Sequence, residues 1–113
     1  MRPALYDAHH DILPIKQAGA GAERKTYDVV GPICESTDKF AKGREMTAVR
    51  PGQRIAFMSA GAYGAVLSSS YNARPLVPEV LVNGSSFDII RRRPDFEEMI
   101  ALEKVPDWLT KTA

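Results

Sequence analysis

The sequence has only one cysteine, Cys34, among its 113 residues. A single cysteine can form neither a disulfide within the chain nor a zinc site of several cysteines, and we expect a reducing, cytoplasmic compartment. An excess of charge of one sign is also missing, because 15 Lys and Arg residues face 14 Asp and Glu residues. The formal net charge of +1 therefore gives no electrostatic signature of a partner such as nucleic acid or an anionic membrane.

Long apolar runs are absent as well. The longest nearly uncharged stretch, residues 55–78, is rich in Gly, Ser, Asn and Pro, so it does not predict a membrane-spanning helix. Residues 1–11 have no apolar segment of the kind that secretory signals contain. For 113 residues and 12.4 kDa we expect one domain, because a complete barrel of eight strand–helix units needs roughly 250 residues.

What the sequence does contain is a series of short, strand-like apolar runs, separated by eight glycines and eight prolines. Val, Ile, Tyr and Phe dominate these runs, and several alternate with polar residues, which is typical of half-buried strands. Asn83-Gly84 predicts a two-residue hairpin turn. We therefore predict a mainly all-β fold, a small Greek-key barrel or sandwich of about six to eight strands. The candidate strands are residues 3–8, 11–15, 26–30, 54–59, 79–82 and 87–91.

Helical signals are confined to two segments. Residues 61–70 allow one or two helical turns, and residues 94–103 predict a short C-terminal helix. Pro94 suits a first helical position, and the acidic residues that follow it complement the helix dipole. Phe96, Met99 and Ile100 recur at the spacing of one apolar helix face.

Two segments carry side chains suited to chemistry in a ligand site. Cys34 and Glu35 follow a Gly-Pro turn, where an exposed thiol could act as an acid or a nucleophile. The alternative is a buried small cysteine followed by a surface glutamate. Tyr63 stands between Gly61 and Gly64, where its ring could cover a planar group. The alternative there is a tight turn with a packed tyrosine.

The N-terminal segment offers a third candidate. Arg2 and Tyr6 are four residues apart, so on an extended strand they share one face and together could bind a carboxylate. The alternative is a surface arginine beside a half-buried tyrosine. His9 and His10 are adjacent and would face opposite sides of such a strand, so we expect no metal site there.

Taken in order, these motifs resemble one known family. The chain is similar to the C-terminal sheet domain of the diaminopimelate decarboxylases, which are pyridoxal-phosphate enzymes of fold type III, as are ornithine and arginine decarboxylases. The resemblance covers residues 2 to about 100, and its most specific parts are GPICESTD and SAGAYG. The other matching motifs are RPALYDAHHD, YDVV, FAKGRE, PGQRIAFM, SSSYNARPLVPEVLV and IIRRR.

The resemblance implies that two domains each supply part of the active site. Residues 1–113 would be the C-terminal β domain, which closes the active site. The Schiff-base lysine and the phosphate-binding glycines would lie on an α/β barrel that this chain lacks. Pyridoxal 5'-phosphate would be the cofactor of the full-length enzyme, a head-to-tail homodimer. We expect the chain to be a piece of that enzyme, with an unpaired strand edge and an exposed apolar face.

The resemblance also implies a role for each candidate residue. Arg2 and Tyr6 match residues that bind a substrate carboxylate. Cys34 matches the proton donor, delivered to the site of the partner subunit, and Glu35 matches a residue that recognises the distal amino group of the substrate. Tyr63 matches a residue that contacts both cofactor and substrate.

The implied reaction converts meso-2,6-diaminopimelate to L-lysine and CO2 in lysine biosynthesis, and we expect the chain alone to be inactive. In the ornithine branch the residue after the cysteine resembles Asp, whereas here it is Glu35, which favours diaminopimelate. Two alternatives stay open, an ornithine or arginine decarboxylase domain and a non-catalytic β-domain assembly module.

Overall fold

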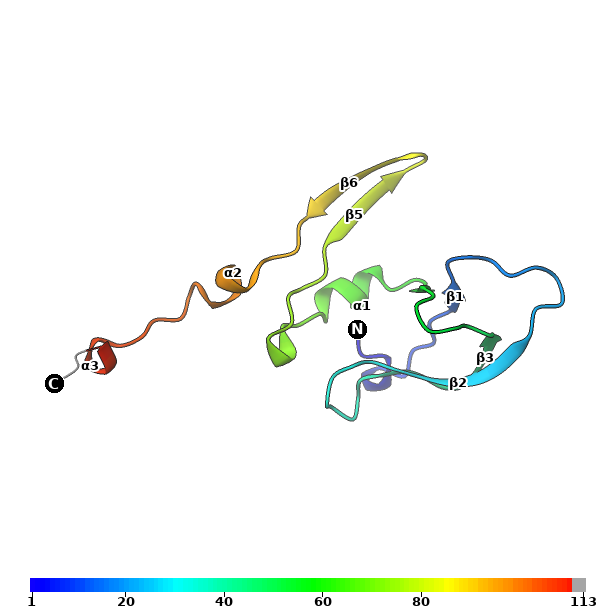
Figure 1. The fold of residues 1–113 in the computed structure, drawn as a ribbon, viewed down its shortest axis with the longest axis horizontal. Helices are drawn as coiled ribbons and strands as arrows, with labels where there is room; N and C mark the ends of the chain where they lie inside the picture. Colours follow the sequence, from blue (N-terminus) through cyan, green and yellow to red (C-terminus); the bar gives the residue numbers. More distant parts are fainter. Residues whose placement is uncertain (111–113) are drawn as a thin grey trace. The chain divides into compact units, whose positions relative to one another are not determined.

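The structure is a computed structural model that describes residues 1–110. The chain divides into two compact units, Met1–Ser68 and Ser69–Ala113. The described part contains six strands that pair antiparallel as three two-stranded sheets, accompanied by short helices (Figure 1). The pairs are β1 (Ile12–Pro14) with β4 (Ile55–Phe57), β2 (Arg24–Val30) with β3 (Lys39–Thr47), and β5 (Glu79–Asn83) with β6 (Ser86–Arg91). The mainly β fold class is therefore confirmed. A closed Greek-key barrel stays a prediction, because no hydrogen-bonded strand joins these pairs within residues 1–110.

The first unit holds two of the sheets and the small apolar core. Ile12 on β1 and Met46 on β3 are its buried apolar side chains, only 4% and 5% exposed. The rings of Phe40 and Phe57 lie 4.7 Å apart and join β3 to β4. The elements of this unit are η1 (Pro3–Leu5), β1 (Ile12–Pro14), β2 (Arg24–Val30), β3 (Lys39–Thr47), β4 (Ile55–Phe57) and α1 (Gly61–Val66).

The predicted strand at residues 3–8 is wrong, because the chain forms the 3-10 turn η1 there. Pro3 stands at the first helical position, where its fixed φ favours a turn. The backbone N–H of Leu5 donates to the carbonyl of Arg2 at 3.0 Å. Asp7 has a φ of +49°, which ends any extended segment. Arg2 and Tyr6 therefore flank a turn and do not share a strand face.

The second unit carries the predicted hairpin. Asn83 pairs with Ser86, so the two-residue loop is Gly84-Ser85, one residue later than predicted. Gly84 has the positive φ, +61°, that such a loop requires. The elements of this unit are η2 (Tyr71–Ala73), β5 (Glu79–Asn83), β6 (Ser86–Arg91), α2 (Phe96–Ile100) and α3 (Asp107–Thr110).

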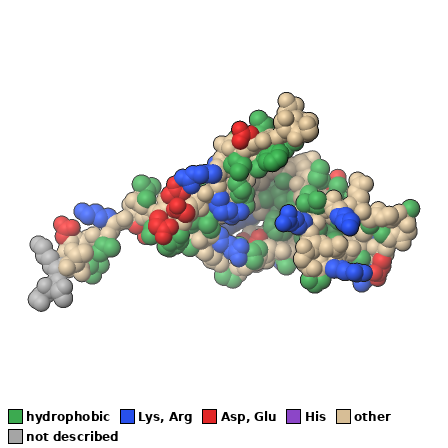
Figure 2. All heavy atoms as spheres, turned by 45° about the horizontal axis from the view of Figure 1, so that its top comes forward, with side chains coloured by type: hydrophobic (Ala, Val, Ile, Leu, Met, Phe, Trp, Pro, Cys, Tyr) green, Lys and Arg blue, Asp and Glu red, His purple; other side chains and the backbone are tan. Residues whose placement is uncertain are grey.

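The β5–β6 hairpin exposes apolar side chains on both faces. Consecutive residues of a strand point to opposite faces, and Leu81 and Val82 are 61% and 66% exposed. Phe87, which pairs with Val82, is 73% exposed. Hydrophobic side chains reach the surface widely between the charged ones in Figure 2. The expected exposed apolar face and unpaired strand edges are thus present in the described residues.

Helix α2 (Phe96–Ile100) begins two residues later than predicted. Pro94 precedes the N-cap, which is Asp95. The Asp95 carboxylate accepts the backbone N–H of Glu98 at 2.8 Å, and the Glu98 carboxylate accepts the backbone N–H of Asp95 at 3.0 Å. This reciprocal capping box satisfies two amides that the helix itself leaves without partners. Arg92 also donates to the Glu98 carboxylate, at 2.6 Å.

These contacts predict an unusual acid titration. The hydrogen bonds from Arg92 and then from the Asp95 amide lower the pKa of Glu98 from 4.5 to about 2. The folded state therefore gains stability from Glu98 above its ordinary pKa, and loses it as pH falls from about 4.5 through about 2. Titration of the side-chain carboxyl by NMR should find Glu98 still ionised at pH 3.5. In Arg92→Ala the pKa should rise towards 4.5, and an unchanged value would contradict the assigned cause.

Candidate functional site

The loop between β2 and β3, residues 31–38, is closed at its base by hydrogen bonds. The amide of Gly31 donates to the Asp38 carbonyl at 2.8 Å. The Asp38 carboxylate accepts the amide of Ile33, also at 2.8 Å. Within the loop, the amide of Glu35 donates to the Ile33 carbonyl at 2.8 Å. This framework presents the exposed Cys34 next to Glu35, which is the first of the two alternatives that the sequence left open.

Gly31 allows the close approach that closes this loop. A Cβ at position 31 would overlap the Asp38 carboxylate. Gly31→Ala should therefore displace Asp38, leave the Ile33 amide without its acceptor, and lower the free energy of unfolding by about 1–3 kcal/mol. The matched control is Gly19→Ala, because a Cβ there meets nothing within 4 Å. Urea denaturation measures both variants, and equal stabilities would contradict this role of Gly31.

Glu35 is held as a carboxylate by its own loop. Its oxygens accept the backbone N–H of Thr37 at 2.9 Å and the Thr37 hydroxyl. The Thr37 hydroxyl, the Thr37 amide and the positive charge of Arg2 lower the pKa of Glu35 below its usual value. The loop therefore presents a carboxylate anion beside the Cys34 thiol at neutral pH.

Tyr6 and Tyr63 form an aromatic pair. Their ring centroids lie 4.8 Å apart with an interplanar angle of 25°. Tyr6 ends η1, and Tyr63 lies on α1, which the chain enters through Ser59 at a φ of +51°. Tyr63 is 54% exposed, so part of its surface stays open to a ligand while Tyr6 supports its ring.

The five predicted site residues all lie in the Met1–Ser68 unit. Tyr6 stacks on Tyr63, and the charge of Arg2 acts on Glu35. Arg2 and Tyr6 flank the same turn, and Cys34 adjoins Glu35 in the sequence.

His10 is a residue of this region that sequence reasoning missed. The residue is buried, and its ring contacts both the Tyr6 hydroxyl and the carbonyl of Met58. The sequence offered only the adjacent pair His9-His10, which says nothing of burial. A tertiary contact 48 positions along the chain was needed to identify it.

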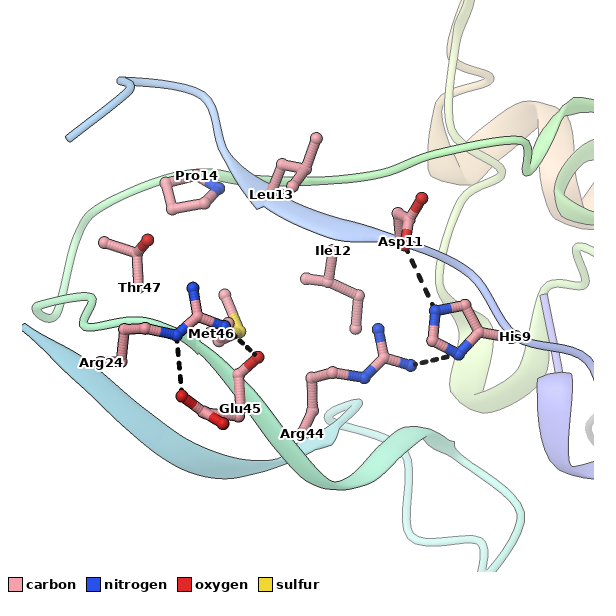
Figure 3. Close-up of a pocket in the computed structure, with 10 residues that line it drawn as sticks. All are labelled: His9, Asp11, Ile12, Leu13, Pro14, Arg24, Arg44, Glu45, Met46 and Thr47. Atoms are coloured by element: carbon pink, nitrogen blue, oxygen red, sulfur yellow. Dashed lines mark hydrogen bonds and ion pairs between the residues drawn. The ribbon is translucent and has the colours of Figure 1, made fainter. Parts of the chain in front are cut away.

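A cavity of about 270 Å³ lies elsewhere in this unit, between β1 and β2–β3 (Figure 3). Its charged side chains already have partners, since Arg24 donates to Glu45 at 2.8 Å and His9 lies 3.3 Å from Asp11. None of the five predicted site residues lines it. Its walls are His9, Asp11, Ile12, Leu13, Pro14, Arg24, Arg44, Glu45, Met46 and Thr47.

Two other classes of feature are missing from residues 1–110. No group of three or more His, Cys, Asp or Glu side chains is arranged to hold a metal ion there. No helix in that range has the length and apolar character needed to cross a membrane.

Comparison with known proteins gives consistent matches. Residues 1–61 match the family described as pyridoxal-dependent decarboxylase, C-terminal sheet domain. Diaminopimelate decarboxylase of Zymomonas mobilis is 45% identical over 109 residues, which are 96% of this chain and 25% of that protein. The Haemophilus influenzae protein of the same name is 48% identical over 103 residues, 91% of this chain and 24% of its own length. The chain thus spans about a quarter of the curated relatives it matches.

Solved structures give the same result. The crystal structure of diaminopimelate decarboxylase from M. jannaschii in co-complex with L-lysine superposes with a TM-score of 0.85 and 35% identity, covering 96% of this chain and 24% of that one. The Helicobacter pylori diaminopimelate decarboxylase, also complexed with L-lysine, gives a TM-score of 0.78 and 39% identity, with 90% and 25% covered.

Proposed function

This chain belongs to the family of C-terminal sheet domains of pyridoxal-dependent decarboxylases, and from that premise we propose that it is the C-terminal domain of a diaminopimelate decarboxylase. The reaction would release CO2 from meso-2,6-diaminopimelate and leave L-lysine. The observation that carries this proposal is the similarity of 109 residues, 96% of the chain, to the diaminopimelate decarboxylase of Zymomonas mobilis at 45% identity. Arg2, Cys34 and Glu35 lie in one compact unit, Met1–Ser68. Close relatives that carry the name diaminopimelate decarboxylase support the proposal.

The substrate explains why two opposite charges are needed. Diaminopimelate has a second amino acid centre, far from the bond that breaks, which carries both a carboxylate and an ammonium. Arg2 would bind the carboxylate, with Tyr6 beside it, and Glu35 would bind the ammonium. Ornithine lacks the distal carboxylate. A closed, desolvated site would therefore leave Arg2 without its partner and reject ornithine.

Cys34 would supply the proton that replaces CO2. Pyridoxal phosphate, when bound, supplies an electron sink for the charge left by decarboxylation. The exposed thiol fits the role of a general acid that delivers a proton to carbon from one face. The exposed ring of Tyr63 fits contact with a planar cofactor. We assign the Schiff-base lysine and the phosphate contacts to the family's α/β barrel.

The site would therefore be assembled from several parts. We propose that this domain works against a lysine-bearing α/β barrel and in a head-to-tail homodimer, in which Cys34 reaches the site of the partner subunit. We place the enzyme in the cytoplasm, where reducing conditions keep a catalytic thiol from forming disulfides.

A chimeric enzyme tests this function. In it, this chain replaces the matching quarter of the Zymomonas mobilis diaminopimelate decarboxylase, and folding is checked by circular dichroism. We expect turnover of meso-diaminopimelate with at least about tenfold preference over ornithine and arginine. A preference for ornithine or arginine would contradict the proposed substrate. A folded chimera that decarboxylates none of the three would contradict a catalytic role and support an assembly module.

A further inference from the structure

His10 joins two of the segments that carry the candidate site. Its Nδ1 lies 3.1 Å from the carbonyl oxygen of Met58, five residues before Tyr63. Its Nε2 lies 3.4 Å from the Tyr6 hydroxyl, and Tyr6 stacks on Tyr63. These contacts form a closed circuit, from His10 through Tyr6 to Tyr63 and back along the chain through Met58.

The geometry selects one tautomer of His10. A carbonyl oxygen can only accept a hydrogen bond, so Nδ1 must carry the proton that points at Met58. In the neutral ring, Nε2 then has a lone pair, and it accepts the proton of the Tyr6 hydroxyl. That hydrogen bond directs the lone pairs of the Tyr6 oxygen away from His10. His10 is buried, with 5% of its surface exposed, so water does not compete freely for either nitrogen.

Arg44 on β3 holds the backbone of this histidine. Its Nη1 donates to the carbonyl of His10 at 3.0 Å. Its Nη2 donates to Nδ1 of His9 at 3.1 Å, the contact that Figure 3 shows. Because His9 accepts at Nδ1, its proton is on Nε2, which lies 3.3 Å from the Asp11 carboxylate. The two neighbouring histidines are therefore held in opposite tautomers. Arg44 thus links β3, the strand that follows the Cys34 loop, to the segment that carries Tyr6.

We propose that His10 is a positioning residue, which in its Nδ1–H tautomer fixes the Tyr6–Tyr63 pair for substrate and cofactor. Its effect on catalysis rests on the proposed function, whereas its tautomer and contacts do not. His10 touches no reacting atom and acts through Tyr6 and through the backbone that leads to Tyr63. Its loss should therefore weaken binding more than it slows the chemical step.

The first test uses the unmodified chain and does not depend on catalysis. The sequence has two histidines, so long-range ¹⁵N–¹H NMR of the rings at pH 7.5 gives two assignable patterns. We expect the proton of His10 on Nδ1 and the proton of His9 on Nε2. Tyr6→Phe should perturb Nε2 of His10 and leave His9 unchanged. A His10 ring with its proton on Nε2, or protonated on both nitrogens, would overturn the proposal.

The second test uses the chimeric enzyme. His10→Asn can keep the contact with Met58 but is too short to reach Tyr6, and we expect KM to rise about 3- to 10-fold with kcat changed less than twofold. In a Tyr6→Phe background the same substitution should add little, because the hydroxyl it acts through is gone. His9→Asn is the matched control and should leave both constants within twofold. If the effects of His10→Asn and Tyr6→Phe on KM were fully additive, the positioning role would be overturned. If the NMR spectra showed the expected tautomer of His10 but the chimera were inactive, only the proposed function would be contradicted.

Discussion

Cys34→Ala in the chimeric enzyme should lower kcat by about 10²- to 10⁴-fold, which is the usual contribution of a general acid. The loop amides that hold Glu35 and Asp38 do not depend on the sulfur, so the loop keeps its shape. Substrate binding should therefore survive, with KM changed less than about threefold. Steady-state kinetics with meso-diaminopimelate measures both constants, and Lys39→Ala, an exposed position at the start of β3, is the control.

The outcome separates a chemical role from a structural one. A Cys34→Ala enzyme with nearly full kcat would contradict the assignment of the thiol as proton donor. Serine at position 34 should not restore the rate, because a hydroxyl is a much weaker acid than a thiol.

Glu35→Gln should lower kcat/KM for meso-diaminopimelate by about 10²- to 10³-fold, because it removes one partner of a desolvated charge pair. Glutamine keeps the size of the side chain and can still accept the Thr37 amide. The loss should therefore come from recognition of the substrate ammonium. Glu45→Gln is the matched control, since Glu45 pairs with Arg24 outside the candidate site.

Substrate preference provides a second test of the role of Glu35 in recognition. Glu35→Asp withdraws the carboxylate by one methylene, so the ratio of kcat/KM for meso-diaminopimelate over ornithine should fall. If Glu35→Gln and Glu45→Gln lowered kcat/KM equally, Glu35 would have no special part in recognition.

The elements predicted best were those set by local sequence. The β5–β6 hairpin follows from alternating apolar runs around Asn83-Gly84, and the glycine does supply the positive φ, although the loop starts one residue later. Helix α2 likewise follows from its acidic first turn. The first helical residue is Phe96 and not Pro94, because the reciprocal hydrogen bonds between Asp95 and Glu98 determine where the helix begins.

The errors and omissions come from tertiary structure or from competing local signals. Residues 3–8 have strand-like composition, but Pro3 and the positive φ of Asp7 turn them into η1. His10 could not be identified from sequence, because its burial depends on a contact with Met58. The contact between Tyr6 and Tyr63 likewise depends on the tertiary structure and could not be predicted from the sequence. The roles of the five site residues came from resemblance and stay predictions.

The most direct measurement of these roles is a crystal structure of the chimeric enzyme with L-lysine bound. The α-carboxylate of lysine should lie about 3 Å from the guanidinium of an Arg2, and its α-ammonium about 3 Å from a Glu35 carboxylate. Its ε-carbon, from which CO2 has departed, should lie within about 4 Å of a Cys34 sulfur. L-lysine held in the closed enzyme without contact to any of these three side chains would contradict the account.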